Sequence, residues 1–398
     1  MMKLTQIEEP LRLVAESKGF ALWQLGFRPF FLLASVFAAL SIGLWAAQFA
    51  GWLPRPYLSG PLWHAHEMLF GFTLAVMVGF LFTAGRNWSN RPTPTGLPLA
   101  ALALLWVAGR VLVLTPFGWA AAIVNAAFPL AAAAALAVPF WAARNRRNYF
   151  FVGLLVLMGM AEMGVHLSQL GVLNLPAWLG VQIALDIVLF IMAVMAGRVI
   201  PMFTNNGVPG AGAVHHAMLD NTALASVLAL LAADLLRLHG PALVTIAVVG
   251  ALAHGLRWAL WKPWKTWCTP LVWVLHAAYA WIPLHLALRA ASELGWVSGS
   301  VATHALTVGA AGGLVIGMMT RTARGHTARP MRADRFDIAG YALVLTAALV
   351  RVGLPVAAPA WAMHAVICSA GLWSAGFGLY AVRYWPVLTH PRLDGKPG

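Results

Sequence analysis

Charge is scarce in this chain. Only 10% of its 398 residues are Asp, Glu, Lys or Arg, whereas 61% are hydrophobic and the mean hydropathy is +0.77. An ordinary soluble domain carries about 25% charged residues. The composition therefore leaves little room for a soluble domain and predicts an integral membrane protein.

Cysteine is nearly absent too. Cys268 and Cys368 are the two cysteines, and neither belongs to a Cys-x-x-Cys or Cys-x-x-Cys-His pattern. This excludes a zinc ribbon, a redox dithiol and covalently attached haem. The sequence also lacks a Walker loop, a dinucleotide fingerprint, a zinc-protease motif and a short apolar signal-peptide region at its start.

What the chain does have is a series of apolar stretches of membrane length. One crossing needs about 20 residues, and these runs are continuously apolar, as helices are, rather than alternating as barrel strands are. The twelve predicted spans are 28–50, 62–84, 97–116, 118–141, 149–171, 178–200, 220–238, 241–261, 268–290, 301–320, 337–357 and 360–385. The prediction is an all-α integral membrane protein with one bundle over 28–386 and cytoplasmic segments at 1–27 and 387–398.

The basic residues give the orientation. With both termini in the cytoplasm, 21 of the 26 Lys and Arg residues fall on the cytoplasmic side and five on the other. This is a strong positive-inside signal. Basic loops that face anionic lipid also account for the net charge of +14, and no nucleic-acid-binding motif accompanies it.

Ionisable residues stand at the head of the second and tenth spans, on the predicted periplasmic side. They are His64, His66 and Glu67 in one span and His304 in the other. Such residues are costly in a membrane and indicate function. Glu162 and His166, one helical turn apart, are expected to pair with each other or to bind copper.

An internal repeat links these two spans. His66, Gly71, Gly79 and Arg86 have the same spacing as His304, Gly309, Gly317 and Arg324. The sixth span ends in Ala-Gly-Arg at Arg198, as the second does at Arg86. The pattern favours three four-helix units. The alternative is that small residues and a terminal arginine recur in any membrane helix.

The repeat makes His66 and His304 the expected axial ligands of a haem, because two imidazoles from facing helices complete a six-coordinate iron. At 100° per residue, His64 and His66 point to nearly opposite sides, while His64 and Glu67 share a face. His64, Glu67 and His276 are then expected to support the haem or to form a nearby metal site, with Arg110 and Arg289 available for the propionates. Gly309, Gly313 and Gly317 fit either a groove for a porphyrin or close packing against another helix, and helix packing is the favoured interpretation.

Six motifs together resemble the NnrS family. They are GFRPFFLLA (Gly26–Ala34), WHAHEMLFGF (Trp63–Phe72), GRVIPMFTNNG (Gly197–Gly207), WKPWKT (Trp261–Thr266), HAAYAWIPL (His276–Leu284) and GMMTRTARGHTARP (Gly317–Pro330). The resemblance spans nearly the whole chain. It implies a twelve-helix protein of the bacterial inner membrane that binds haem and copper and belongs to the response to nitric oxide. Where the family loop usually reads LGHTGRP, this chain has Ala328 in place of the second glycine.

The resemblance implies that ten residues of this chain occupy functional positions of the family motifs. They are His64, His66, Glu67, Arg198, Thr204, His276, Tyr279, His304, Arg321 and His326. The expected cofactors are haem b and copper, and the expected partners are nitric oxide, the lipid bilayer and a quinol or other electron donor. A nitric-oxide-related oxidoreductase and a haem sensor both remain open, and transport of a metal ion or small solute is the alternative. Haem–copper oxidases share the twelve-helix plan, with pseudo-threefold symmetry, but the sixth and seventh spans here lack their copper-binding histidines.

Overall fold

The computed structural model describes residues 19–52 and 56–396, and within these residues it is helical without a strand. Eleven helices or helix series in this part of the chain are long and apolar enough to cross a membrane, and a twelfth, α4, is a shorter apolar helix. All twelve predicted spans are helical, so the all-α membrane fold is confirmed. Residues 1–18 and 397–398 of the predicted terminal segments lie outside the described residues.

The first six crossings are α1 (Phe27–Phe49), α2–η1–α3 (Gly60–His66, Glu67–Thr73, Leu74–Ser89), α4 (Gly96–Leu112), α5 (Gly118–Ala142), η2–α6 (Arg146–Asn148, Tyr149–Gln169) and α7 (Ala177–Gly207). The next six are α8 (Ala217–Leu235), α9–η3 (Pro241–Leu260, Pro263–Lys265), α10–α11 (Pro270–Tyr279, Trp281–Glu293), α12–η4–α13 (Gly299–His304, Ala305–Gly312, Gly313–His326), α14 (Arg335–Ala357) and η5–α15 (Pro359–Trp361, Ala362–Thr389).

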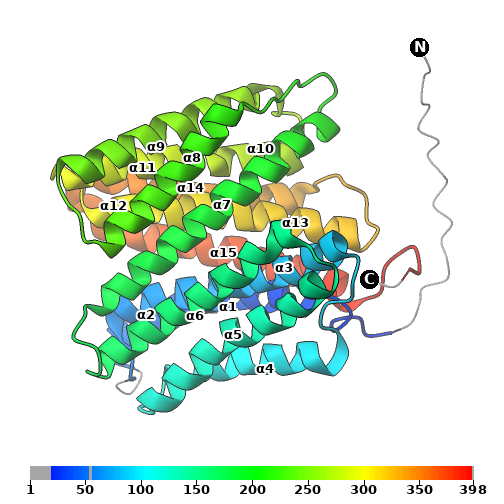
Figure 1. Cartoon of the computed structure of the whole chain (residues 1–398), viewed down its shortest axis with the longest axis horizontal. Helices are drawn as coiled ribbons and strands as arrows, with labels where there is room; N and C mark the ends of the chain where they lie inside the picture. Colours follow the sequence, from blue (N-terminus) through cyan, green and yellow to red (C-terminus); the bar gives the residue numbers. More distant parts are fainter. Residues whose placement is uncertain (1–18, 53–55, 397–398) are drawn as a thin grey trace.

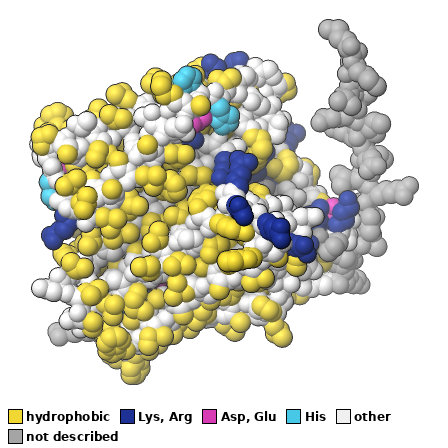
Figure 2. All heavy atoms as spheres, in the orientation of Figure 1, with side chains coloured by type: hydrophobic (Ala, Val, Ile, Leu, Met, Phe, Trp, Pro, Cys, Tyr) yellow, Lys and Arg dark blue, Asp and Glu magenta, His cyan; other side chains and the backbone are white. Residues whose placement is uncertain are grey.

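The first and last helices meet at one end of the bundle (Figure 1). The buried Arg28 donates to the carbonyls of Leu388 and His390, at 3.0 and 2.8 Å. We call this the basic end. The opposite end, where α2 and α12 begin, is called the histidine end. Figure 2 shows hydrophobic side chains spread over the flank of the bundle and Lys and Arg side chains gathered towards the right-hand end, as a membrane protein requires.

The second, sixth and tenth crossings are the most enclosed helices. Within their most apolar stretch, 83% of residues are buried in the second crossing and 67% in each of the sixth and tenth, compared with at most 61% in the other candidate spans. These three crossings also carry the repeated arginines, and they recur every fourth crossing. The arrangement fits three four-helix units around a shared centre.

The repeat is also visible in the backbone. A π-helical segment, η1, follows directly after His66, and a second, η4, follows directly after His304. π-Helical turns are rare and frequently occur at functional sites. The two histidines of the repeat therefore occupy the same structural position, each at the junction of an α-helix with a π-helical turn.

One predicted span is interrupted. The ninth crossing divides into α10 and α11 at Ala280, three residues before Pro283. Proline lacks the N–H that would bond the carbonyl of Tyr279, and its ring crowds that carbonyl.

The glycines of the tenth crossing lie against the ninth. A Cβ at Gly309 would overlap the ring of Trp281, and one at Gly313 would lie 2.6 Å from the Cβ of Ala278. A Cβ at Gly317 would lie 2.9 Å from side-chain atoms of Val274 and Leu275. These contacts agree with helix packing, the use that the sequence favoured.

We expect Gly313→Ala to destabilise the protein by about 1–3 kcal/mol, because the added methyl group meets the short, rigid Ala278 in a packed interface. Thermal unfolding of the detergent-solubilised protein measures the change. Gly353→Ala in α14 is the matched control, since a Cβ there has nothing within 4 Å. Equal unfolding temperatures for the two variants would contradict the packing assignment.

Candidate functional site

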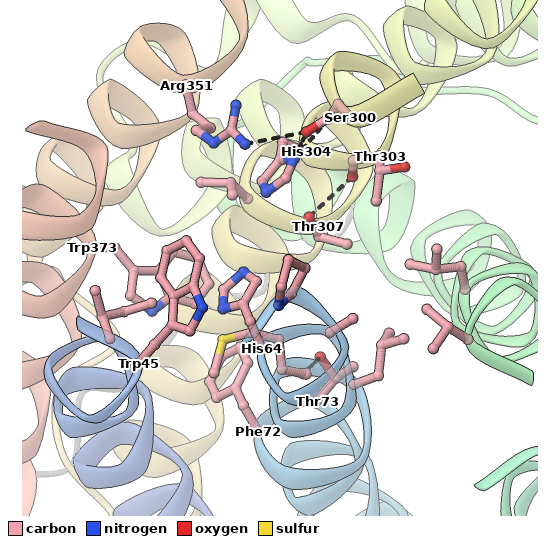
Figure 3. Close-up of a pocket in the computed structure, with 18 of the residues that line it drawn as sticks. Trp45, His64, Phe72, Thr73, Ser300, Thr303, His304, Thr307, Arg351 and Trp373 are labelled. Carbon is pink, nitrogen blue, oxygen red and sulfur yellow. Dashed lines mark hydrogen bonds between the residues drawn. The ribbon is translucent and has the colours of Figure 1, made fainter. Parts of the chain in front are cut away.

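A cavity of about 600 Å³ opens at the histidine end of the bundle. His64 from α2 and His304 from α12 face it, together with Trp45, Arg351 and Trp373 from α1, α14 and α15 (Figure 3). The volume lies in the range of about 300–1,000 Å³ that small-molecule and cofactor pockets occupy. With α7, which adds Gln182, six crossings from the first, middle and last parts of the sequence build one pocket.

The two histidines form a nearly parallel pair. Their ring centroids are 6.4 Å apart, and the ring planes differ by 11°. Two imidazoles that bind one metal from opposite sides have ring centroids about 6 Å apart, given metal–nitrogen distances of about 2 Å. Trp45 stacks on His64 at 4.8 Å and fixes the direction of its ring. The spacing of the pair therefore fits two axial ligands of one iron.

Hydrogen bonds set the tautomer of His304. Its Nδ1 lies 2.6 Å from the carbonyl oxygen of Ser300, so Nδ1 carries the proton and donates. Nε2 is then left with a free lone pair, which is the arrangement found in metal-ligating histidines. Nδ1 of His64 is buried and has no partner among the described residues.

Among the residues that the structure describes, one arginine lines this cavity. Arg351 donates from Nη2 to Ser300 Oγ at 3.2 Å, and Thr303 and Thr307 line the cavity close to His304 (Figure 3). A guanidinium in a largely apolar pocket suits a carboxylate of the ligand. Arg351 was not among the predicted site residues, although it is one of the five basic residues on the predicted periplasmic side.

A second cluster lies on the other face of α2. His66 meets Glu162 and His166 from α6, and ligand atoms of the three side chains lie within 4.8 Å of one another. His66 Nε2 is 3.2 Å from His166 Nε2 and 3.5 Å from Glu162 Oε1. All three residues are buried. Two imidazoles and a carboxylate are a ligand set that suits copper, zinc or iron.

The neighbours of this cluster leave its metal-binding atoms unprotonated. His66 Nδ1 lies 2.8 Å from Glu67 Oε1 and donates to it, and His166 Nδ1 lies 3.4 Å from the Tyr57 hydroxyl. Both Nε2 atoms then present lone pairs to each other. Neither oxygen of Glu162 has a hydrogen-bond partner in the described part of the chain. Arg110 Nη2 lies 3.8 Å from Glu162 Oε1, and the three facing acceptors form a ligand set that could hold a metal ion.

Further contacts hold the cluster in position. Arg110 Nη1 lies 2.6 Å from Glu67 Oε1, and Arg110 also bonds Asn125. The Tyr57 hydroxyl donates to the backbone carbonyl of His166 at 3.0 Å. Burial raises the pKa of Tyr57 to about 12, so this hydroxyl keeps its proton at neutral pH. Such outer contacts orient metal ligands and raise their affinity.

The expected pairing of His66 with His304 is not what the structure shows. His304 faces His64, while His66 points to α6. The predicted separation of His64 from His66 does occur, but it is His64 that meets His304, and Glu67 contacts His66 rather than sharing a site with His64. The physical reason is the rotation of α2 about its axis, which its packing against α1, α6 and α7 decides.

Other predicted residues lie elsewhere. His276 Nε2 contacts Thr204 Oγ1 at 2.8 Å, and the Tyr279 hydroxyl contacts His254 Nδ1 at 2.6 Å. Arg321 lies 3.6 Å from the ring centroid of Phe203. None of His276, Tyr279 and Arg321 lines the 600 Å³ cavity, so the structure does not bring them to His64 and His304.

Arg110 and Arg289, the expected propionate partners, are absent from the lining of that cavity as well. Arg110 belongs to the Glu67 network, and Arg289 pairs with Asp234. Gln182, which does line the cavity, donates to Asp186 Oδ1 and Asp234 Oδ2 at 3.2 Å each. A buried acidic cluster therefore borders the pocket.

Comparison with known proteins agrees with this arrangement. The family described as NnrS protein matches residues 21–392. No curated protein matches the chain. The matched range contains all twelve crossings and both histidine sites, so the chain belongs to the NnrS family.

Proposed function

We propose that this protein holds haem b between His64 and His304 and a copper ion between His66, Glu162 and His166, and that it binds or processes nitric oxide to protect the cell from nitrosative stress. The observation that carries the proposal is the pair of sites on opposite faces of α2, each with two facing imidazoles. Membership of the NnrS family supports the link with nitric oxide.

The residues of the cavity have separate tasks in this proposal. His64 and His304 would hold the iron, and Arg351 would neutralise a carboxylate of the porphyrin. Trp45, Phe72 and Trp373 give the cavity an apolar wall that would exclude water from a bound porphyrin. When bound, a haem supplies an iron that takes nitric oxide and exchanges one electron.

The residues around the metal cluster would balance part of the charge of a bound metal ion. The Glu162 carboxylate offsets part of the charge of a bound cation, and the Glu67–Arg110 pair at its border is neutral overall. Glu67 also keeps His66 in the tautomer that presents Nε2. We favour copper because the family binds it and because imidazole nitrogens suit it.

The distribution of Lys and Arg supports a placement with both termini in the cytoplasm of a bacterium, and hence both sites towards the periplasmic side of the inner membrane. Turnover of nitric oxide would need an electron donor such as a quinol. A sensor would need the same two sites without the donor.

Visible spectroscopy tests the proposal. Protein purified from cells with ample haem should show a Soret band that shifts on reduction with dithionite and again when nitric oxide is added. Elemental analysis of the same sample should find copper. Absence of a Soret band from that protein would exclude the haem assignment.

A further inference from the structure

A second cavity, of about 490 Å³, lies towards the basic end of the bundle, where α3, η2, α7, α8 and α9 approach one another. Arg147, Arg198 and Arg257 line it, together with His215 and Asp220. Figure 2 shows Lys and Arg side chains over the right-hand ends of α6 and α7, with an acidic and a histidine side chain near them. This cavity belongs to neither histidine site.

The charges around this cavity do not balance. Arg257 Nε lies 2.6 Å from Asp220 Oδ1, so that pair is neutral. Arg198 and Arg147 form no ion pair with any carboxylate of residues 19–52 and 56–396. Two guanidinium groups therefore face one cavity without a counter-charge from the described residues. Arg198 is partly withdrawn from water, which favours an anion beside it, and the exposed Arg147 lines the same cavity.

Arg198 is held in place by neutral groups. Its Nη1 donates to Asn148 Oδ1 at 3.1 Å, and its guanidinium carbon lies 5.6 and 5.8 Å from the ring centroids of Phe150 and Phe151. Asn148 itself is buried. These contacts use one edge and one face of the guanidinium, and they leave its other donors for a ligand in the cavity.

Gly197 explains how a second arginine reaches the same wall. A Cβ at this position would overlap the guanidinium of Arg257. The Ala-Gly-Arg sequence at the end of the sixth span thus admits Arg257 beside α7 and presents Arg198 one residue later. In the second span, the corresponding Gly85 packs against Leu136 instead. The glycine of this motif therefore makes room for a charged side chain in the sixth span and for an apolar side chain in the second.

We propose that this cavity is a phosphate-binding site, in which Arg198 and Arg147 bind the oxygens of a phosphate group. The planar fork of arginine donors matches phosphate oxygens, and basic pockets between membrane helices bind anionic head groups. Trp88, Val194 and Leu224 supply apolar wall beside the arginines. An anionic lipid head group and free inorganic phosphate both carry the required chemistry, and the experiment separates them. This site is independent of haem and copper.

The test is ligand-induced stabilisation of the delipidated, detergent-solubilised full-length protein. Three probes are added separately: phosphatidylglycerol, zwitterionic phosphatidylcholine and inorganic phosphate. Phosphatidylglycerol or inorganic phosphate should raise the unfolding temperature, and phosphatidylcholine should not. Arg198→Gln should weaken the effective ligand about ten-fold, because one charge-assisted pair is lost. Glutamine keeps an N–H donor for Asn148, so the fold should persist.

Arg147→Gln gives an independent reading, because Arg147 is exposed and its replacement does not disturb packing. Arg91→Gln, an exposed arginine at the same end, is the control for net charge and should bind like wild type. A response to phosphatidylglycerol alone assigns the site to lipid, and a response to inorganic phosphate assigns it to the free anion. The proposal is overturned if Arg198→Gln and Arg147→Gln match Arg91→Gln, if phosphatidylcholine acts as strongly as phosphatidylglycerol, or if no probe stabilises the protein.

Discussion

Replacing His304 with glycine is expected to lower the haem content of the purified protein at least about ten-fold, because loss of even an outer contact to a metal ligand weakens metal binding about 10–100-fold. Pocket geometry gives the reason. His304 faces His64 at 6.4 Å, and its Nδ1 is committed to Ser300, so a ligand would be lost for which the cavity offers no substitute. Pyridine haemochrome analysis of the purified variant measures the haem.

Free imidazole should restore the missing ligand. His304→Gly leaves a space of the right size, so haem content and the position of the Soret band should return towards wild type when imidazole is present during purification. Rescue of this kind separates a direct ligand from a residue that only supports the fold. His364→Ala is the control, because His364 is exposed and does not line the cavity. Unchanged haem content in His304→Gly would contradict the ligand assignment.

The copper content should fall most in variants of the second cluster. Glu162→Gln keeps the shape of the side chain and removes its charge, and His166→Ala removes an imidazole 3.2 Å from that of His66. Each should weaken copper binding on the order of 100-fold. Mass spectrometry of the metal content after dialysis against a chelator of known affinity measures the change.

His285→Gln controls for the loss of a buried histidine. His285 donates from Nδ1 to the carbonyl of Ala302 at 2.7 Å, a bond that glutamine can also make, and it does not belong to the three-residue cluster. If Glu162→Gln and His166→Ala retain copper, the cluster is not a copper site. The same conclusion follows if His285→Gln loses as much copper as those two variants.

The course of the chain through the membrane could be predicted from sequence because it depends on length and apolar composition. Even α8, a short crossing that contains Asp234, lies where the hydropathy placed it. The repeat of His66 and His304 was also readable, and the π-helical turns after both residues show that it reflects shared structure. The break at Ala280 was missed although Pro283 signals it.

The partners of each histidine could not be predicted because α2 is apolar on several faces. Spacing alone separates His64 from His66, but the rotation of the helix decides which of them meets α12 and which meets α6. The spacing of Glu162 and His166 within one helix predicts that they pair with each other or bind copper. Their third ligand, His66, lies 100 residues away in the sequence, and only tertiary packing brings it near.

The central claim is that α2 presents two neighbouring histidines to two different cofactors. The direct measurement is the haem and copper content of His64→Leu and His66→Leu, purified side by side. His64→Leu should lose haem and retain copper, whereas His66→Leu should lose copper and retain haem. Since the two positions lie two residues apart in one helix, little more than half a turn, damage to the fold would affect both variants alike. Loss of haem in His66→Leu with haem retained in His64→Leu would contradict the account.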